Sequence, residues 1–127
     1  MKQRVLIAMS LIANPKILVL DEPTTALDVV VQHSILKLIH ELKERLGLSV
    51  MWITHDLAVL SEVCERIAIM YAGRIVEKGY AEDLILDPKH PYTMGLLASF
   101  PTIDQLDKKL AAIPGTPPNL LTPPSGC

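Results

Sequence analysis

The sequence lacks the features that would assign it to a membrane-spanning, exported or nucleic-acid-binding class of protein. No apolar run approaches the roughly 18 residues that a membrane-spanning helix needs. The start of the chain has no basic segment followed by a long apolar core, as a signal peptide would have. The chain has 12 basic and 14 acidic residues, and the basic residues form no cluster. This argues against a surface that binds nucleic acid or lipid headgroups.

Cysteine is scarce, and one nucleotide-binding motif is absent. Cys64 and Cys127 are the only two cysteines of the 127 residues, which predicts no disulfide framework and fits a reducing cytoplasm. The sequence contains no G-x-x-x-x-G-K-[ST] loop, the backbone cradle for nucleotide phosphates. The composition is 50% hydrophobic with a mean hydropathy of +0.33. A small chain with such an apolar composition is expected to expose apolar surface that a partner would cover.

What is present is the pattern of an α/β fold. Residues 17–20 read as a buried strand and residues 49–54 as a second one. Between them, Asp28 can cap a helix that ends at Gly47. The apolar stripe of this helix is Val31, Ile35, Leu38, Ile39, Leu42 and Leu46. A strand-helix-strand unit of this kind predicts two parallel strands with a right-handed crossover.

The flanking segments predict further short elements. Residues 1–13 have the composition of a buried helix, and residues 57–64 read as a short helix. Residues 67–71 and 74–79 can pair as a hairpin around Ala72-Gly73, followed by a helix over 81–86. Five prolines fall at the end of the chain, so we expect residues 114–127 to form neither helix nor strand and to run over the surface.

Acidic side chains and a histidine follow the two predicted parallel strands. Asp21 and Glu22 come directly after the first strand, and His55 follows the second. Because the carboxyl ends of parallel strands meet at one edge, these side chains should border the same crevice. An Asp there can hold Mg²⁺ through its water shell, and a neighbouring Glu can orient an attacking water. For Asp21 alone, an ordinary turn or capping carboxylate is the simpler interpretation.

The complete pattern resembles a known family. Residues 17–23 look like the Walker B segment of an ABC-type ATPase, residues 25–28 like its D-loop and His55 like its switch histidine. Residues 1–5 are similar to the segment that follows the family's LSGG signature, which itself does not occur in the chain. The resemblance implies an incomplete P-loop NTPase-like parallel sheet with flanking helices. It also implies that the strand of the phosphate loop belongs between residues 49–54 and residues 67–71, and that a chain without it is prone to association.

The resemblance also implies roles for the acids and the histidine, with ATP and Mg²⁺ as cofactors. Asp21 would contact Mg²⁺ through a water, Glu22 would polarise the attacking water, and His55 would donate a hydrogen bond to the γ-phosphate. A chain without the phosphate loop and the signature is expected to be inactive by itself.

Three further residues take roles at the edge of the implied site. Asp28 would organise the interface of a head-to-tail pair of ATPase subunits, and Gln3 and Arg4 would help to place the signature. The implied partners are the second ATPase subunit, the permease subunits in the membrane and, indirectly, an extracytoplasmic peptide-binding protein. No nucleic acid is implied.

A second resemblance covers the end of the chain. Residues 90–93, 96–97, 113–118 and 123–127 look like the C-terminal extension of ATPases that serve oligopeptide, dipeptide and nickel importers. It implies an ATPase part at 1–87 and a partial extension at 88–127, in a subunit bound peripherally to the cytoplasmic face of the membrane. In some relatives this segment continues with cysteines for an iron-sulfur cluster, so an intact protein could carry one. Cys127 alone cannot hold a cluster that is usually ligated by four residues.

Other interpretations stay open at this point. A soluble ABC-family ATPase would share Asp21, Glu22, Asp28 and His55 without serving a transporter, and the segment from His90 to Cys127 argues against it. A non-catalytic interaction module is the second alternative, because the phosphate cradle is missing. The proline-rich end could also be an arbitrary linker. The sequence does not identify the solute or the permease.

Overall fold

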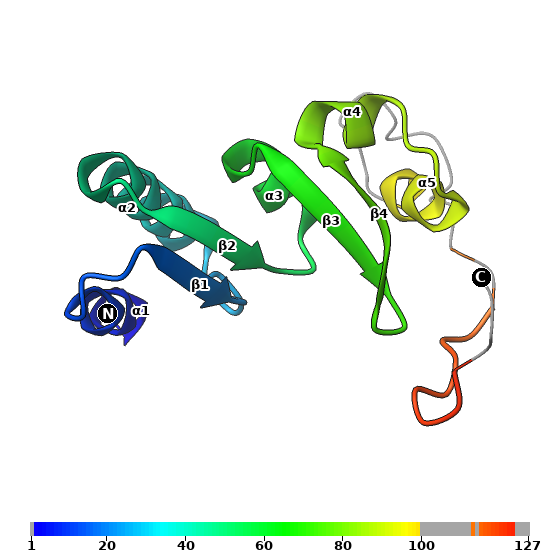
Figure 1. Cartoon of the computed structure of the whole chain (residues 1–127), viewed down its shortest axis with the longest axis horizontal. Coiled ribbons are helices and arrows are strands. Elements are labelled where there is room, and N and C mark those ends of the chain that lie inside the picture. The colour runs from blue at the N-terminus through cyan, green and yellow to red at the C-terminus, as the bar shows by residue number, and fades with distance from the viewer. Residues whose placement is uncertain (1, 100–112, 114, 124–127) are drawn as a thin grey trace. The chain divides into compact units, whose positions relative to one another are not determined.

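The computed structural model describes residues 2–99, 113 and 115–123. The chain divides into two compact units, residues 1–63 and residues 64–127, which we call the N-terminal and the C-terminal unit and describe separately (Figure 1). The predicted domain boundary between residues 87 and 88 concerns the family's domains and stays a prediction. Among the helices that the structure describes, none combines the length and apolarity needed to cross a membrane.

The N-terminal unit is the predicted strand-helix-strand unit with a helix at each end. Its elements are α1 (Lys2–Leu11), β1 (Ile17–Asp21), α2 (Val29–Leu46), β2 (Ser49–Ile53) and α3 (Leu57–Val63). The strands pair in parallel, with Ile17 opposite Ser49 and Asp21 opposite Ile53, so the predicted pairing is confirmed. The ends of these elements differ from the prediction by one or two residues at most.

Both ends of α2 form as the sequence predicts. The Asp28 carboxylate accepts a hydrogen bond of 2.9 Å from the backbone N–H of Val31, and so satisfies one of the free donors of the first turn. Gly47 ends the helix in the left-handed conformation with φ 63°, and its N–H donates to the carbonyl of Lys43. These two local signals set the length of the crossover between β1 and β2.

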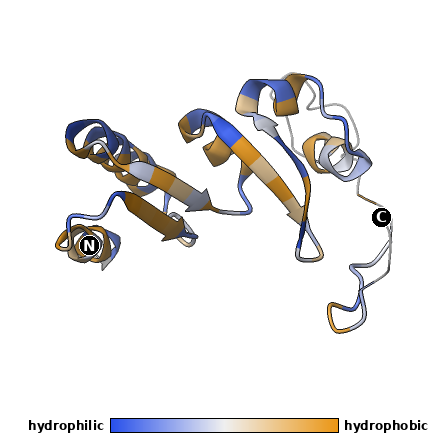
Figure 2. Cartoon of the chain, viewed as in Figure 1, coloured by the Kyte–Doolittle hydropathy of each residue, from blue (hydrophilic) through white to orange (hydrophobic). Residues whose placement is uncertain are grey.

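The core of the N-terminal unit lies on one face of its two-stranded sheet. Leu18 and Leu20 point from β1 toward the two helices α1 and α2. The buried cluster consists of Ile7, Leu18, Leu20, Ile35 and Ile39, with Leu11, Leu27, Leu42, Val50 and Trp52 packed against it. β1 is hydrophobic along most of its length (Figure 2). Its alternate residues Ile17 and Val19 are exposed on the opposite face.

The C-terminal unit begins with the predicted hairpin. β3 (Arg66–Tyr71) pairs antiparallel with β4 (Arg74–Tyr80) around a turn in which Ala72 and Gly73 have φ of 49° and 77°. The register shifts between Ile69 and Met70. α4 (Ala81–Leu86) follows at the predicted place and buries Ala81 and Leu84. β2 and β3 belong to separate sheets in the described structure, so the phosphate-loop strand expected between them stays a prediction.

One helix, α5 (Pro91–Ala98), was not predicted from the sequence. His90 caps it and Pro91 occupies its first turn, which is a recognised start signal, since proline lacks the N–H that would be unpaired there. The predicted proline-rich tail agrees with residues 115–123, which form bends and a turn and are mostly exposed. Residues 114 and 124–127 of that prediction lie outside the described residues.

Candidate functional site

The carboxyl ends of β1 and β2 are joined beyond the sheet itself. Asp21 is the last residue of β1 and lies opposite Ile53, the last residue of β2. The next residue, Glu22, donates its backbone N–H to the carbonyl oxygen of Ile53 at 2.9 Å. This bond holds Glu22 at the end of β2, two residues before His55.

Glu22 and His55 are in direct contact. Nδ1 of His55 lies 2.7 Å from Oε1 of Glu22, and the other carboxylate oxygen of Glu22 accepts a hydrogen bond from the hydroxyl of Thr25. Glu22 has φ 49°, a left-handed conformation that is uncommon for a residue with a side chain. Such a conformation costs free energy and persists only where the surroundings hold it, and here its backbone and its carboxylate are both bonded.

The contact changes the titration of both groups. The hydrogen bond from Thr25 is the largest cause that lowers the pKa of Glu22, and the bond to His55 lowers it further. The hydrogen bond to Glu22 and the charge of its carboxylate raise the pKa of His55. The side chains remain 40% and 76% exposed for Glu22 and His55, so water and a ligand can reach them. The site therefore presents an ionised carboxylate with an imidazole that tends toward its charged form.

The other predicted site residues take different places. Asp21 is exposed beside Glu22, and its carboxylate makes no hydrogen bond with the residues that the structure describes. Asp28 is engaged as the cap of α2. Gln3 and Arg4 lie in the first turn of α1, and their side chains make no hydrogen bond or ion pair with other described residues. The structure thus brings Glu22 and His55 together, with Asp21 next to them in sequence.

Two polar residues near the site have functions that the sequence analysis missed. Thr25 binds the Glu22 carboxylate, and the spacing of three residues in a turn was the signal for this contact. Asp56 accepts hydrogen bonds from the N–H groups of Ala58 and Val59 and so caps α3. The start of α3, and with it the position of the segment carrying His55, is therefore fixed locally.

The candidate metal ligands are carboxylates at the strand ends. No group of three or more His, Cys, Asp or Glu side chains is placed to hold a metal ion within the described part of the chain. A single exposed Asp21 carboxylate is still a suitable oxygen ligand for Mg²⁺, which keeps most of its waters and takes its other ligands from phosphates. An iron-sulfur cluster finds no support. Cys64 is half-buried and Cys127 lies outside the described residues.

Comparison with known proteins shows what the chain is similar to. Residues 76–127 match the model of the family described as "Oligopeptide/dipeptide transporter, C-terminal region". The chain is 55% identical over 127 residues to the oligopeptide transport ATP-binding protein OppD of Bacillus subtilis, covering 99% of this chain. It is 52% identical over 126 residues to the dipeptide transport ATP-binding protein DppD of Lactococcus lactis, again covering 99% of this chain. The chain is therefore similar, over nearly all of its length, to the matching part of these transport ATP-binding proteins.

These two relatives are longer than the present chain. The chain spans 36% of the length of each of those two relatives. A solved structure, that of cbiO1 from Clostridium perfringens, described as part of the ABC transporter complex cbiONQ, has a TM-score of 0.62 and 34% identity. The similarity covers 66% of this chain and 34% of that one. Both resemblances stated from the sequence, and the α/β fold of an incomplete ABC ATPase, are thereby confirmed.

Proposed function

We propose that this sequence supplies the water-activating part of an ATP-hydrolysing subunit that energises an importer of oligopeptides or dipeptides. The observation that carries the proposal is the contact of 2.7 Å between Glu22 and His55 at the carboxyl ends of two parallel strands. The contact supports the proposal because a general base and a ligand of the γ-phosphate would have to lie side by side. The names of the relatives, both transport ATP-binding proteins, support the choice of reaction.

Each group of the pair keeps a free position for chemistry. Each oxygen of the Glu22 carboxylate accepts one bond, and a carboxylate oxygen has room for a second, so Glu22 can accept a hydrogen bond from an attacking water. His55 contacts Glu22 through Nδ1, which leaves Nε2 for a phosphate oxygen. Because Glu22 raises the pKa of His55, the imidazole favours the form in which Nε2 carries a proton and can donate it in a hydrogen bond.

The remaining residues of the site would bind and position. Asp21 would hold Mg²⁺ through a water, Asp28 would lie toward the second ATPase subunit of a head-to-tail pair, and Gln3 and Arg4 would support the signature. When bound, Mg²⁺ and ATP supply a γ-phosphoryl group whose charge the metal neutralises. The phosphate cradle and the LSGG signature do not occur in these 127 residues, so another part of the protein has to provide them.

The location and the partners follow from the same proposal. A subunit of this kind would lie at the cytoplasmic face of the membrane and drive permease subunits, which receive peptide from an extracytoplasmic binding protein. The match of residues 76–127 to a transporter family favours this over a soluble ABC-family ATPase without a transporter. A non-catalytic module remains the second candidate, and a nucleotide titration separates it from an enzyme.

The test is made in a protein of full length, in which this chain replaces the matching segment of the OppD protein of Bacillus subtilis. Glu22→Gln keeps the size of the side chain and removes the base, so ATP hydrolysis should fall by about 100-fold or more while ATP binding is retained. Glu44→Gln, an exposed substitution on α2, serves as the matched control and should change neither. An equal loss of binding and hydrolysis in Glu22→Gln contradicts the assigned role.

The isolated chain provides a second test. Without the phosphate loop and the signature we expect no ATP hydrolysis by the 127 residues, even with Mg²⁺. The measurement is phosphate release over time, compared between the chain and its Glu22→Gln variant. Steady turnover by the chain that this substitution abolishes would show that the present residues suffice and would refute the expected inactivity.

A further inference from the structure

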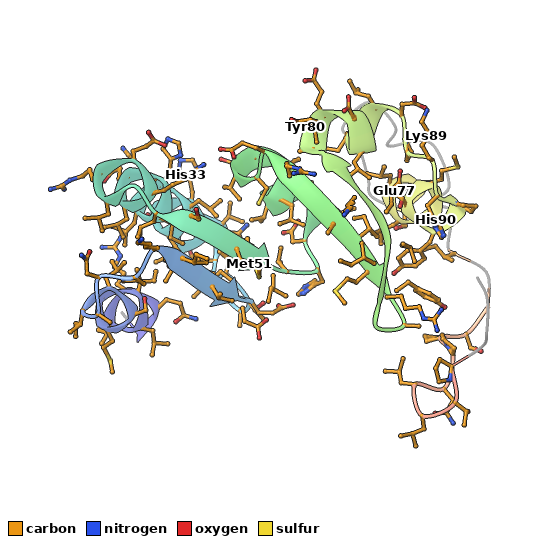
Figure 3. The ribbon with its side chains drawn as sticks, viewed as in Figure 1. His33, Met51, Glu77, Tyr80, Lys89 and His90 are labelled. Carbon is orange, nitrogen blue, oxygen red and sulfur yellow. The ribbon has the colours of Figure 1, made fainter. Side chains whose placement is uncertain are left out.

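Glu77, in the middle of β4, binds a segment that lies well beyond it in the sequence. Its Oε1 accepts the backbone N–H of Lys89 at 2.8 Å, and its Oε2 accepts the backbone N–H of His90 at 3.0 Å. The donors follow Glu77 by 12 and 13 residues, after α4. Figure 3 shows the three residues close together beside α5. Both oxygens of one carboxylate therefore hold two successive peptide groups.

Those two peptide groups stand at the start of α5. His90 is the cap of this helix, and its Nδ1 accepts the N–H of Tyr92 at 3.1 Å. Pro91, the next residue, has no N–H to be satisfied. The donors before the helix are thus bound by Glu77 and the donor inside its first turn by His90, which leaves the helix start fully bonded at these positions.

Side-chain packing continues the contact along α5. The rings of Tyr71 on β3 and Tyr92 on α5 lie 4.5 Å apart at an interplanar angle of 47°. Thr93 is the most deeply buried residue of this helix, with 1% of its surface exposed. Farther on, Ile113 packs so closely on Gly95 that a Cβ atom at position 95 would lie 3.0 Å from its Cγ1. The hairpin, α5 and residue 113 are therefore in contact in that order.

The carboxylate of Glu77 is held in its charged form. Partial desolvation acts to raise the pKa of Glu77, but Thr93 and the backbone N–H groups of Lys89 and His90 lower it below the usual value of 4.5. Hydrogen bonds to an ionised acceptor are stronger than those between neutral groups. Two such bonds can compensate for the low intrinsic stability of a helix of only eight residues.

We propose that Glu77 is a latch that docks α5 onto the β3–β4 hairpin, and that releasing its two hydrogen bonds frees α5 while the hairpin remains. In this inference residues 90–93 are a docking segment, with His90 as a helix cap and Tyr92 as a ring contact. Residues 76–127, the region that matches the transporter family, contain both the latch and the helix that it holds. The inference is independent of the proposed ATPase function, because all its residues lie in the C-terminal unit.

The test uses the whole 127-residue chain and the substitution Glu77→Gln. Glutamine has the same size as glutamate but only one acceptor oxygen in place of two. Its NH₂ group is a donor and would face one of the two backbone N–H groups, which are also donors. Amide hydrogen exchange at Lys89 and His90 and along α5 should speed up by roughly tenfold or more, while the amides of the β3–β4 ladder keep their rates. Glu82→Gln, an exposed substitution in α4, is the matched control and should leave both sets unchanged.

Unchanged exchange at Lys89, His90 and α5 in Glu77→Gln would overturn the latch. If Glu77→Gln also loses the hairpin, a pH titration of the unaltered chain tests the latch instead. On acidification, the amide protons of Lys89 and His90 should shift together with a midpoint below 4.5, since both report the same carboxylate. Two amide signals that do not respond to acid, or that respond with different midpoints, would refute a shared bond to Glu77.

Discussion

At the scale of single residues, the candidate site depends on the conformation of Glu22. The sequence alone places an acid and a histidine after two parallel strands, which is enough to expect them at one edge of the sheet. It does not predict their contact, because that requires φ 49° at Glu22 and the backbone bond to Ile53. A residue other than glycine seldom adopts a left-handed conformation, so local sequence propensity does not predict this geometry.

The first prediction is that Glu22 controls the titration of His55. In the unaltered chain the pKa of His55 should lie above its ordinary value of 6.5, and Glu22→Gln should return it toward that value by removing the negative charge. NMR titration of the imidazole signals measures both. Glu44→Gln, an exposed substitution on α2, is the control and should leave the pKa of His55 as it is in the unaltered chain.

The same contact predicts the pH range in which the pair stabilises the fold. Since the pKa of Glu22 is lowered, the contribution of Glu22 to the free energy of unfolding is present above pH 4.5. It is lost as the pH falls through the pKa of the folded state. Since the pKa of His55 is raised, the contribution of His55 to the free energy of unfolding is present below pH 6.5. It is lost as the pH rises through the pKa of the folded state. A His55 pKa that does not move in Glu22→Gln would show that the two groups do not interact in solution.

At the scale of elements, local signals suffice for some helices and not for others. α2 has an apolar stripe, a capping Asp28 and a terminal Gly47, so its sequence predicts it to within a residue or so. α5 has only eight residues in a proline-rich part of the chain and no comparable stripe. Its contacts with Glu77 and Tyr71 are tertiary, and a pattern within the segment cannot reveal them.

The second prediction concerns the cap of α2. Asp28→Ala removes the acceptor for the N–H of Val31 and should lower the free energy of unfolding by about 1 kcal/mol. Asp28→Asn keeps an acceptor at the same place and should cost only a few tenths as much. Denaturant unfolding followed by circular dichroism measures the difference, with Glu44→Ala on the same helix as control. Equal losses in the alanine and asparagine variants would mean that charge, and not capping, is what Asp28 contributes.

At the scale of the whole molecule, the distribution of apolar side chains explains what the composition indicated. The N-terminal unit buries one face of its β1–β2 sheet under α1 and α2. The opposite face carries exposed Ile17, Val19, Met51 and Ile53. The sequence predicted surplus apolar surface from its mean hydropathy, but only the register of the two strands shows that these four side chains share one face.

The third prediction is that the isolated chain associates through this face. Val19 and Met51 lie opposite each other in the ladder and are each 56% exposed, so they form the centre of a contiguous apolar patch. Val19→Lys places a charge in that centre without touching the buried face, and should therefore shift the chain toward the monomer. Sedimentation over a wide range of concentrations measures the shift. Leu121→Lys, at a more exposed position outside the sheet, adds the same charge and should leave association as it was. If both lysine variants dissociate the chain equally, net charge and not the sheet face governs association.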